Sequence, residues 1–117
     1  MNKVTIWHNP RCSKSREALS LLEQHECEKD IIKYLESSPD KEQIKVVLKM
    51  LGVTPRELMR TKEDIYKELE LQKEQNEEKL IEAMVLHPKL IERPIIIKGE
   101  KAIIARPPSL VEQFLID

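Results

Sequence analysis

A strand, a helix and a second strand open this chain, and this order constrains the fold more than any other feature of the sequence. Residues 3–7 have the pattern of a strand, residues 13–24 that of an amphipathic helix, and residues 29–35 that of a second strand. When two such strands join one sheet, the connection is almost always a right-handed parallel crossover. The chain is therefore predicted to begin as a βαβ unit.

A β-hairpin and a helix are predicted near the other end of the chain. Two isoleucine-rich segments, residues 94–97 and 102–105, flank a turn that contains Gly99. A last helix follows residues 106–109, and its apolar face is expected to hold Leu110, Val111, Phe114 and Leu115. The βαβ and ββα units together predict an α/β fold, in which helices cover a small mixed sheet.

The segment between these units, about residues 40–91, is predicted to be a mostly helical insertion. An amphipathic helix ends at Gly52, and Thr54 caps the helix that follows. Further helices are expected over residues 63–71 and 77–86, with a polar bridge between them. The second strand, the insertion and the hairpin follow one another along the chain, and the sequence contains no internal repeats.

Length and composition narrow the class of protein. The 117 residues suit one domain, residues 1–117, and the content of 40% hydrophobic and 35% charged residues is typical of a globular chain. A net charge of −1 argues against nucleic-acid binding, and no apolar run is long enough to span a membrane. With two cysteines and no export signal in the sequence, we expect a cytoplasmic protein.

The turn between the first strand and the first helix carries the strongest chemical signal. It places Cys12 at the start of a helix, where unpaired backbone N–H groups and the helix dipole favour negative charge. A thiol there ionises more easily, and the thiolate is its reactive form. The same N–H groups can hold an oxyanion. Positively charged and polar neighbours favour a reactive thiol over a buried inert one.

A second thiol within the same motif is missing, because the residue three positions after Cys12 is Ser15. A helix over residues 13–24 is about 18 Å long, which puts Cys27 beyond the roughly 7 Å that separate disulfide-bonded Cα atoms. Cys27 is therefore interpreted as structural. Any redox cycle at Cys12 is expected to need an external thiol.

Two residues near Cys12 have alternative interpretations. Ser15 either donates a hydrogen bond to the Cys12 thiolate or caps the first turn of the helix, and both roles are compatible. His8 either stabilises the thiolate as a nearby cation or faces water at the end of its strand. Asn9 and Pro10 are expected to shape the turn.

Three arginines are candidates for binding an oxyanion, which the guanidinium group holds through two hydrogen bonds. They are Arg60, Arg93 and Arg106, and their spacing alone does not place them in one site. The histidines and cysteines do not have the spacing of metal ligands, and the chain lacks a glycine-rich phosphate loop. No metal and no bound cofactor are expected.

Four segments together resemble a known family, the glutaredoxin-coupled arsenate reductases, a branch of the thioredoxin/glutaredoxin-like fold. The segments are His8-Asn9-Pro10-x-Cys12-x-x-Ser15-Arg16, Glu57-Leu58-Met59-Arg60, Glu92-Arg93-Pro94-Ile95 and Arg106-Pro107-Pro108. The resemblance covers essentially the whole chain. It implies a thioredoxin-like sheet with the helical insertion described above.

The resemblance also implies an activity and a set of roles. Cys12 would attack arsenate, His8 and Ser15 would help to hold it as the thiolate, and Pro94 would be a cis-proline facing it. The oxyanion would be bound by Arg60, Arg93 and Arg106. Glutathione as co-substrate would supply the next thiol, and glutaredoxin would resolve the mixed disulfide, with release of arsenite.

One departure from the family pattern concerns the substrate, and the Cys-x-x-Ser motif and the expected fold leave two other functions open. Ser13-Lys14 follows the cysteine, where arsenate reductases of this type commonly carry Gly-Thr. The first alternative is a monothiol glutaredoxin-like oxidoreductase that acts on glutathionylated thiols. The second is a non-catalytic regulator that binds RNA polymerase, although many such regulators use a Cys-x-x-Cys switch that Ser15 removes here.

Overall fold

The computed structural model describes residues 3–25, 28–92 and 94–116. The chain divides into two compact units. The first combines Met1–Ser37 with Arg93–Asp117, and the second is Ser38–Glu92. That all 117 residues work as one domain stays a prediction.

A four-stranded mixed sheet forms the first unit, in the order β2-β1-β3-β4. Its strands are β1 (Lys3–Trp7), β2 (Glu28–Ile32), β3 (Ile95–Lys98) and β4 (Lys101–Ile104). β1 and β2 are parallel, whereas β3 is antiparallel to both β1 and β4. The predicted βαβ and ββα units are therefore confirmed.

β2 ends three residues earlier than the sequence pattern predicted. The N–H groups of Glu36 and Ser37 both donate to the Lys33 carbonyl at 2.9 Å. This turn bends the chain directly after Ile32, so the apolar residues beyond it cannot continue the ladder. The turn also leaves the Lys33 and Glu36 side chains exposed, just beyond the C-terminal end of β2.

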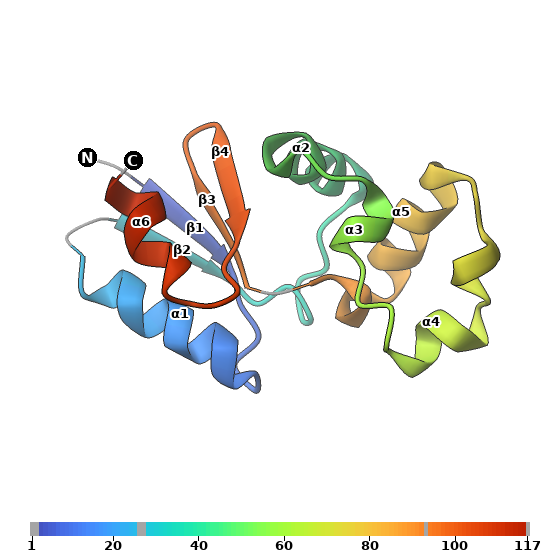
Figure 1. Cartoon of the computed structure of the whole chain (residues 1–117), viewed down its shortest axis with the longest axis horizontal. Coiled ribbons are helices and arrows are strands. Elements are labelled where there is room, and N and C mark those ends of the chain that lie inside the picture. Colours follow the sequence, from blue (N-terminus) through green and yellow to red (C-terminus); the bar gives the residue numbers. More distant parts are fainter. Residues whose placement is uncertain (1–2, 26–27, 93, 117) are drawn as a thin grey trace. The chain divides into compact units, whose positions relative to one another are not determined.

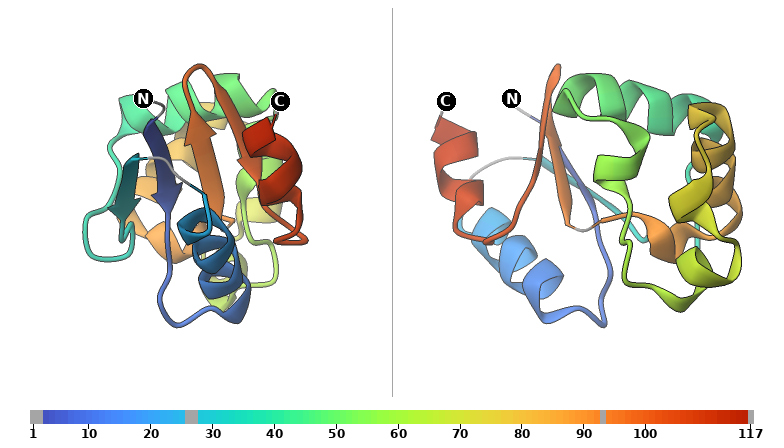
Figure 2. Two further views of the ribbon diagram at one scale, coloured as in Figure 1. Left: turned by 90° about the vertical axis from the view of Figure 1, so that its left-hand side faces the viewer. Right: turned by 45° about the vertical axis from the view of Figure 1, so that its right-hand side comes forward.

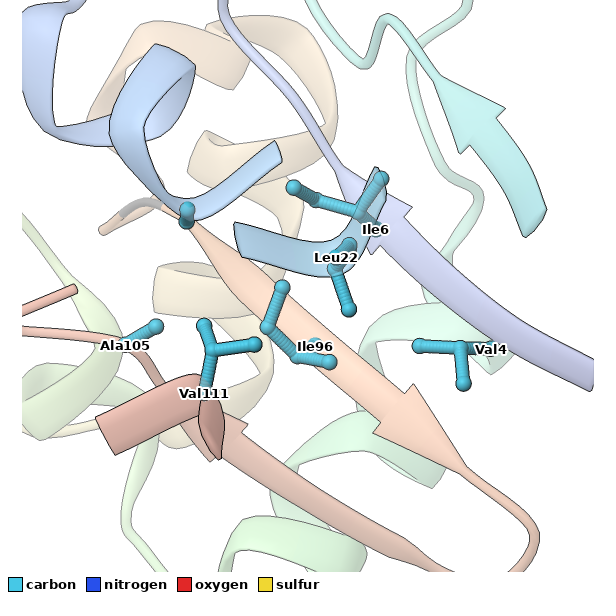
Figure 3. Packing of buried hydrophobic residues seen from close by; sticks show 7 residues of the cluster. Val4, Ile6, Leu22, Ile96, Ala105 and Val111 are labelled. Carbon is cyan, nitrogen blue, oxygen red and sulfur yellow. The ribbon is translucent and has the colours of Figure 1, made fainter. Parts of the chain in front are cut away.

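Two helices, α1 (Ser13–Glu23) and α6 (Leu110–Ile116), lie on one face of this sheet (Figures 1 and 2). Side chains from both helices meet those of the central strands in one core, in which Leu22, Ile96 and Val111 are fully buried (Figure 3). Such burial is the main stabilising contribution to a small sheet. The predicted face of the last helix needs one correction, because Leu110 is 42% exposed.

The hairpin turn depends on a glycine. Lys98 pairs with Lys101, so only Gly99 and Glu100 connect β3 to β4. Gly99 has a φ of +61°, in the left-handed region that residues with a Cβ adopt at a cost. Because β3 runs antiparallel to β1, and Val4 lies opposite Lys98, this turn is at the end of the sheet away from the Cys12 turn.

The second unit is helical, as predicted for the insertion between the two halves of the sheet. It consists of α2 (Lys41–Leu51), α3 (Pro55–Leu58), α4 (Asp64–Glu68), η1 (Leu71–Lys73), α5 (Glu77–Leu86) and η2 (Pro88–Leu90). The caps are local: Asp40 and Thr54 each form a capping box, and Gly52 ends α2 with a φ of +69°.

The helix predicted over residues 63–71 is much shorter in the structure. α4 stops at Glu68, and Glu70 adopts a left-handed φ of +52°. The guanidinium of Arg56 donates to the carbonyls of Leu71 and Glu74 and to the hydroxyl of Tyr66. These non-local bonds hold the segment in a bent path, which a helical periodicity cannot reveal.

Two distant segments of the second unit pair beside Arg60. An isolated antiparallel bridge joins Met59 to Ile91. The Arg60 N–H donates to the Leu90 carbonyl at 2.7 Å, and the Glu92 N–H donates to the Leu58 carbonyl at 2.8 Å. We call this pairing of residues 58–60 with 90–92 the Arg60 clip. It brings the Arg60 side chain next to that of Glu92.

Candidate functional site

Cys12 lies at the N-cap of α1, in the turn that follows β1. Its backbone is extended, with φ −95° and ψ 123°, and its carbonyl accepts the first helical N–H, that of Arg16, at 3.0 Å. The Cys12 side chain is half-buried. The thiol is thus at the mouth of a helix of 11 residues, where the backbone N–H groups of the first turn favour an anion.

Hydrogen bonds within a few residues fix the shape of the Cys12 turn. The Cys12 N–H donates to the Asn9 carbonyl, and the Arg11 N–H donates to Asn9 Oδ1, both at 3.0 Å. The Asn9 N–H donates in turn to Ser15 Oγ at 3.0 Å. Asn9 therefore shapes the turn, as the sequence predicted.

His8 and Ser15 form a buried pair behind this turn. Ser15 is fully buried and His8 is 5% exposed. His8 Nδ1 lies 2.7 Å from Ser15 Oγ. The interpretation of His8 as a strand-end residue that faces water is therefore wrong, because the chain packs over the end of β1.

The charge of His8 also differs from the cationic alternative. Burial lowers the pKa of the imidazole below its usual 6.5, and the nearby positive charges of Lys33 and Arg16 lower it further. His8 is consequently neutral near pH 7, so it does not act there as a cation beside the thiolate. Its position indicates an action through the Ser15 hydroxyl.

Of the predicted arginines that the structure describes, Arg106 contacts the sulfur. Its Nη2 donates to Cys12 Sγ at 3.8 Å, although the two residues are far apart in the sequence. Backbone bonds position Arg106 just past β4: its own N–H donates to the Ile104 carbonyl, and the Ala105 N–H donates to the Pro94 carbonyl, each at 2.9 Å. A guanidinium at this distance favours the thiolate over the thiol.

Other predicted residues lie outside the described part of the chain. Arg93 and Cys27 are among them, so their predicted roles stay predictions. The isomer of the Arg93–Pro94 bond stays one for the same reason. Within the described ranges, the cis peptide bond that the structure records joins Arg106 to Pro107.

Arg60 belongs to the second unit and has acidic neighbours. Its Nη1 lies 3.6 Å from a carboxylate oxygen of Glu63, and its Nε lies 3.8 Å from one of Glu92. All three side chains are a little over one quarter exposed. The charge of Arg60 is therefore partly offset within its own unit, and its association with Cys12 stays a prediction.

Sequence reasoning missed the cavity beside the Cys12 turn. The cavity has a volume of about 250 Å³ and is lined by His8, Asn9, Pro10, Arg11, Lys33, Leu35 and Glu36. A general signal was available, because ligands bind outside the carboxyl ends of parallel strands, and β1 and β2 are parallel. The strand predicted over residues 29–35 extended too far toward the C-terminus and hid Lys33 and Leu35.

Metal-ligand clusters and membrane-spanning helices are both absent from the described residues. Within residues 3–25, 28–92 and 94–116, no group of three or more His, Cys, Asp or Glu side chains has the geometry to hold a metal ion. Over the same ranges, no helix has both the length and the apolar character needed to cross a bilayer.

Known proteins resemble this chain over nearly its whole length. The uncharacterized protein YfgD of Escherichia coli K12 is 52% identical over 111 residues, which cover 93% of each chain. The arsenate reductase of Neisseria meningitidis serogroup B is 43% identical over 117 residues, 98% of this chain and 100% of the relative. The solved arsenate reductase structure from Vibrio cholerae has a TM-score of 0.91 and 47% identity, covering 96% of this chain and 97% of that one.

The fold similarity confirms the predicted fold class, a thioredoxin-like α/β sheet. The model of the ArsC family matches residues 7–114. This match spans both units and all six predicted site residues, which are His8, Cys12, Ser15, Arg60, Arg93 and Arg106. The chain belongs to the ArsC family.

Proposed function

We propose that this protein is an arsenate reductase, which converts arsenate to arsenite with Cys12 as the nucleophile. One observation carries the proposal most directly: Cys12 Sγ lies at the N-terminus of α1 with the Arg106 guanidinium 3.8 Å away. This arrangement favours both a thiolate and a bound oxyanion. The arsenate reductases among the relatives support the choice of substrate.

The first step is a condensation without a change of oxidation state. The Cys12 thiolate attacks the arsenic atom of arsenate, an S–As bond forms, and one As–O bond breaks. The departing oxygen takes up protons and leaves as water. Arg106 stabilises the negative charge on the remaining oxygens, and Arg60 and Arg93 are proposed as further ligands of the oxyanion.

The second step transfers two electrons. The sulfur of glutathione attacks Cys12 Sγ, an S–S bond forms, and the S–As electron pair leaves with arsenic as arsenite. Cys12 remains as a mixed disulfide with glutathione, and glutaredoxin resolves it by thiol–disulfide exchange. The electrons come from thiols, so no bound cofactor is needed. A cytoplasmic location is part of the proposal, because the cycle requires reduced thiols.

His8 and Ser15 are proposed to support the thiolate, because of the hydrogen-bond donors that are available around Ser15 Oγ. Ser15 Oγ accepts the Asn9 N–H. With the hydrogen of neutral His8 on Nδ1, His8 also donates to Ser15 Oγ across their 2.7 Å contact. The hydroxyl hydrogen of Ser15 is then left to donate to the Cys12 thiolate.

The test is a direct assay of arsenite formation with glutathione, glutaredoxin and either the wild-type protein or Cys12→Ser. We expect turnover that requires both arsenate and Cys12. A folded, fully reduced wild-type protein that forms no arsenite would refute the proposal. The matched control is Leu86→Ser, at an exposed position in the second unit.

Oxidoreduction of glutathionylated thiols is the second candidate, because Cys12 and Ser15 form a Cys-x-x-Ser motif on a thioredoxin-like fold. The same thiolate would attack the glutathione sulfur of a mixed disulfide, so that the S–S bond to the substrate breaks, the substrate leaves as its thiol, and Cys12 becomes glutathionylated. Turnover of a glutathionylated peptide in the absence of arsenate, at a rate above that of arsenate reduction, would favour this candidate.

A further inference from the structure

The cavity of about 250 Å³ beside the Cys12 turn is built from two chain segments of the first unit. One is the turn itself, residues 8–11, and the other is the segment from Lys33 to Glu36 that follows β2. Its volume is just below the range of about 300–1,000 Å³ that is typical of ligand pockets. It therefore suits one end of a small molecule whose other end extends toward the thiol.

The charged groups that line the cavity are two cations and one carboxylate. Arg11 comes from the Cys12 turn, whereas Lys33 and Glu36 come from a single tight turn, in which the Glu36 N–H donates to the Lys33 carbonyl. An ammonium and a carboxylate on one turn complement the zwitterion of an α-amino acid. Leu35 and Pro10 add apolar surface for methylene groups.

The cavity adjoins the turn that carries Cys12. His8 lines the cavity and also contacts Ser15, and Arg11 directly precedes Cys12 in the chain. The positive charge of Lys33 is close enough to the His8 imidazole to lower its pKa. A molecule held by Lys33 is therefore next to the group that supports Cys12.

We propose that this cavity binds glutathione, with its γ-glutamyl α-amino acid head on Lys33 and Glu36. Glutathione carries two carboxylates and one ammonium, which is the complement of the charges in the cavity. Lys33 receives the α-carboxylate and Glu36 the α-ammonium, while Arg11 attracts the second carboxylate. This inference rests on the proposed function, because it assigns the site of that reaction's second substrate.

The direct test measures binding of S-methylglutathione, which cannot attack a disulfide or arsenic, by calorimetry. We expect Lys33→Glu to weaken binding about tenfold, the typical effect of one charge-assisted hydrogen bond at an exposed site. Lys101→Glu is the matched control, because it makes the same charge change at the far end of the sheet. Equal affinity of the wild-type protein and Lys33→Glu would overturn the proposal.

A charge swap guards against a variant that merely disturbs the fold. Glu36→Lys alone should also weaken binding, and the double variant Lys33→Glu, Glu36→Lys should recover part of the affinity. No recovery, with both single variants folded, would contradict a paired recognition of ammonium and carboxylate.

Kinetics separate this proposal from the proposed function. In arsenate reduction, Lys33→Glu should raise the KM for glutathione and leave the KM for arsenate unchanged. With neutral 2-mercaptoethanol as the reductant, Lys33→Glu should lose much less activity relative to the wild type than it does with glutathione. If the wild-type protein does not reduce arsenate but binds S-methylglutathione in a Lys33-dependent way, the proposed function is refuted and the glutathione site is retained. If the wild-type protein reduces arsenate but its binding of S-methylglutathione does not depend on Lys33, the function is retained and the site is refuted.

Discussion

Two arginines predicted for one site are held by opposite kinds of neighbour. In the first unit, Arg106 donates to the sulfur of Cys12. In the second unit, Arg60 lies between the carboxylates of Glu63 and Glu92. Both guanidinium groups keep their full charge at neutral pH, so the neighbours decide how strongly each attracts an anion. The comparison indicates that Arg106 is directed at the reactive sulfur, whereas Arg60 shares its charge with two carboxylates.

The strongest test of the Cys12 turn replaces the sulfur. We expect Cys12→Ser to lower kcat for arsenate reduction about a thousandfold or more, because an alcohol is a much weaker nucleophile than a thiolate. Arsenite formation measures the effect, and Cys27→Ser serves as the control. Equal losses in both variants would overturn the interpretation of Cys27 as structural.

The two arginines themselves give the next largest effects. We expect Arg106→Ala to lower kcat/KM for arsenate about a hundredfold and Arg60→Ala about tenfold, because Arg106 donates directly to the reactive sulfur, whereas Arg60 shares its charge with Glu63 and Glu92. Arg→Lys variants at both positions separate the loss of charge from the loss of bidentate geometry. An equal effect of the two alanine variants would break the comparison.

Removing one acidic neighbour should bring Arg60 closer to the behaviour of Arg106. We expect Glu63→Gln to lower the KM for arsenate about twofold to fivefold, the range for a partly exposed ion pair. Glu70→Gln is the control, because Glu70 makes an exposed ion pair with Lys73 in the same unit. A higher KM in Glu63→Gln would mean that Glu63 positions Arg60 rather than competing for it.

The smallest expected effect is on the pH dependence of thermal stability, and it arises from His8 in the first unit. The pKa of His8 is lowered in the folded protein, so the unfolded chain binds its proton more tightly. The contribution of His8 to the free energy of unfolding is therefore fully present above the usual pKa of 6.5, and it is lost as the pH falls through the folded-state pKa. Thermal melting from pH 8 to pH 5 should show a weaker pH dependence for His8→Asn.

The same two regions explain what the sequence could reveal. The Cys12 turn is held by bonds such as those between Asn9, Arg11 and Ser15, all within a few residues, so its position after β1 follows from local pattern. The capping boxes of α2 and α3 were likewise readable, because capping chemistry is local.

Long-range contacts produced the errors. Arg56 bends the segment after α4 through carbonyls that lie 15 and 18 residues further along the chain. The 3.8 Å contact of Arg106 with Cys12 depends on the whole sheet, since Arg106 follows its last strand. The neutral state of His8 arises from burial together with Lys33, which no spacing rule connects to it.

The order of the strands has a consequence for synthesis of the chain on the ribosome. β1 lies between β2 and β3, but β3 is made only after the entire second unit. The backbone edge of β1 that pairs with β3 therefore stays unpaired while the helical segment is translated. During that time the apolar side chains of Val4 and Ile6 also lack their neighbours from β3. The nascent Cys12 thiol gains its arginine neighbour only when the last strand has formed. Chemical activity thus appears as one of the final events of folding, and a partly made chain does not carry a complete reactive site.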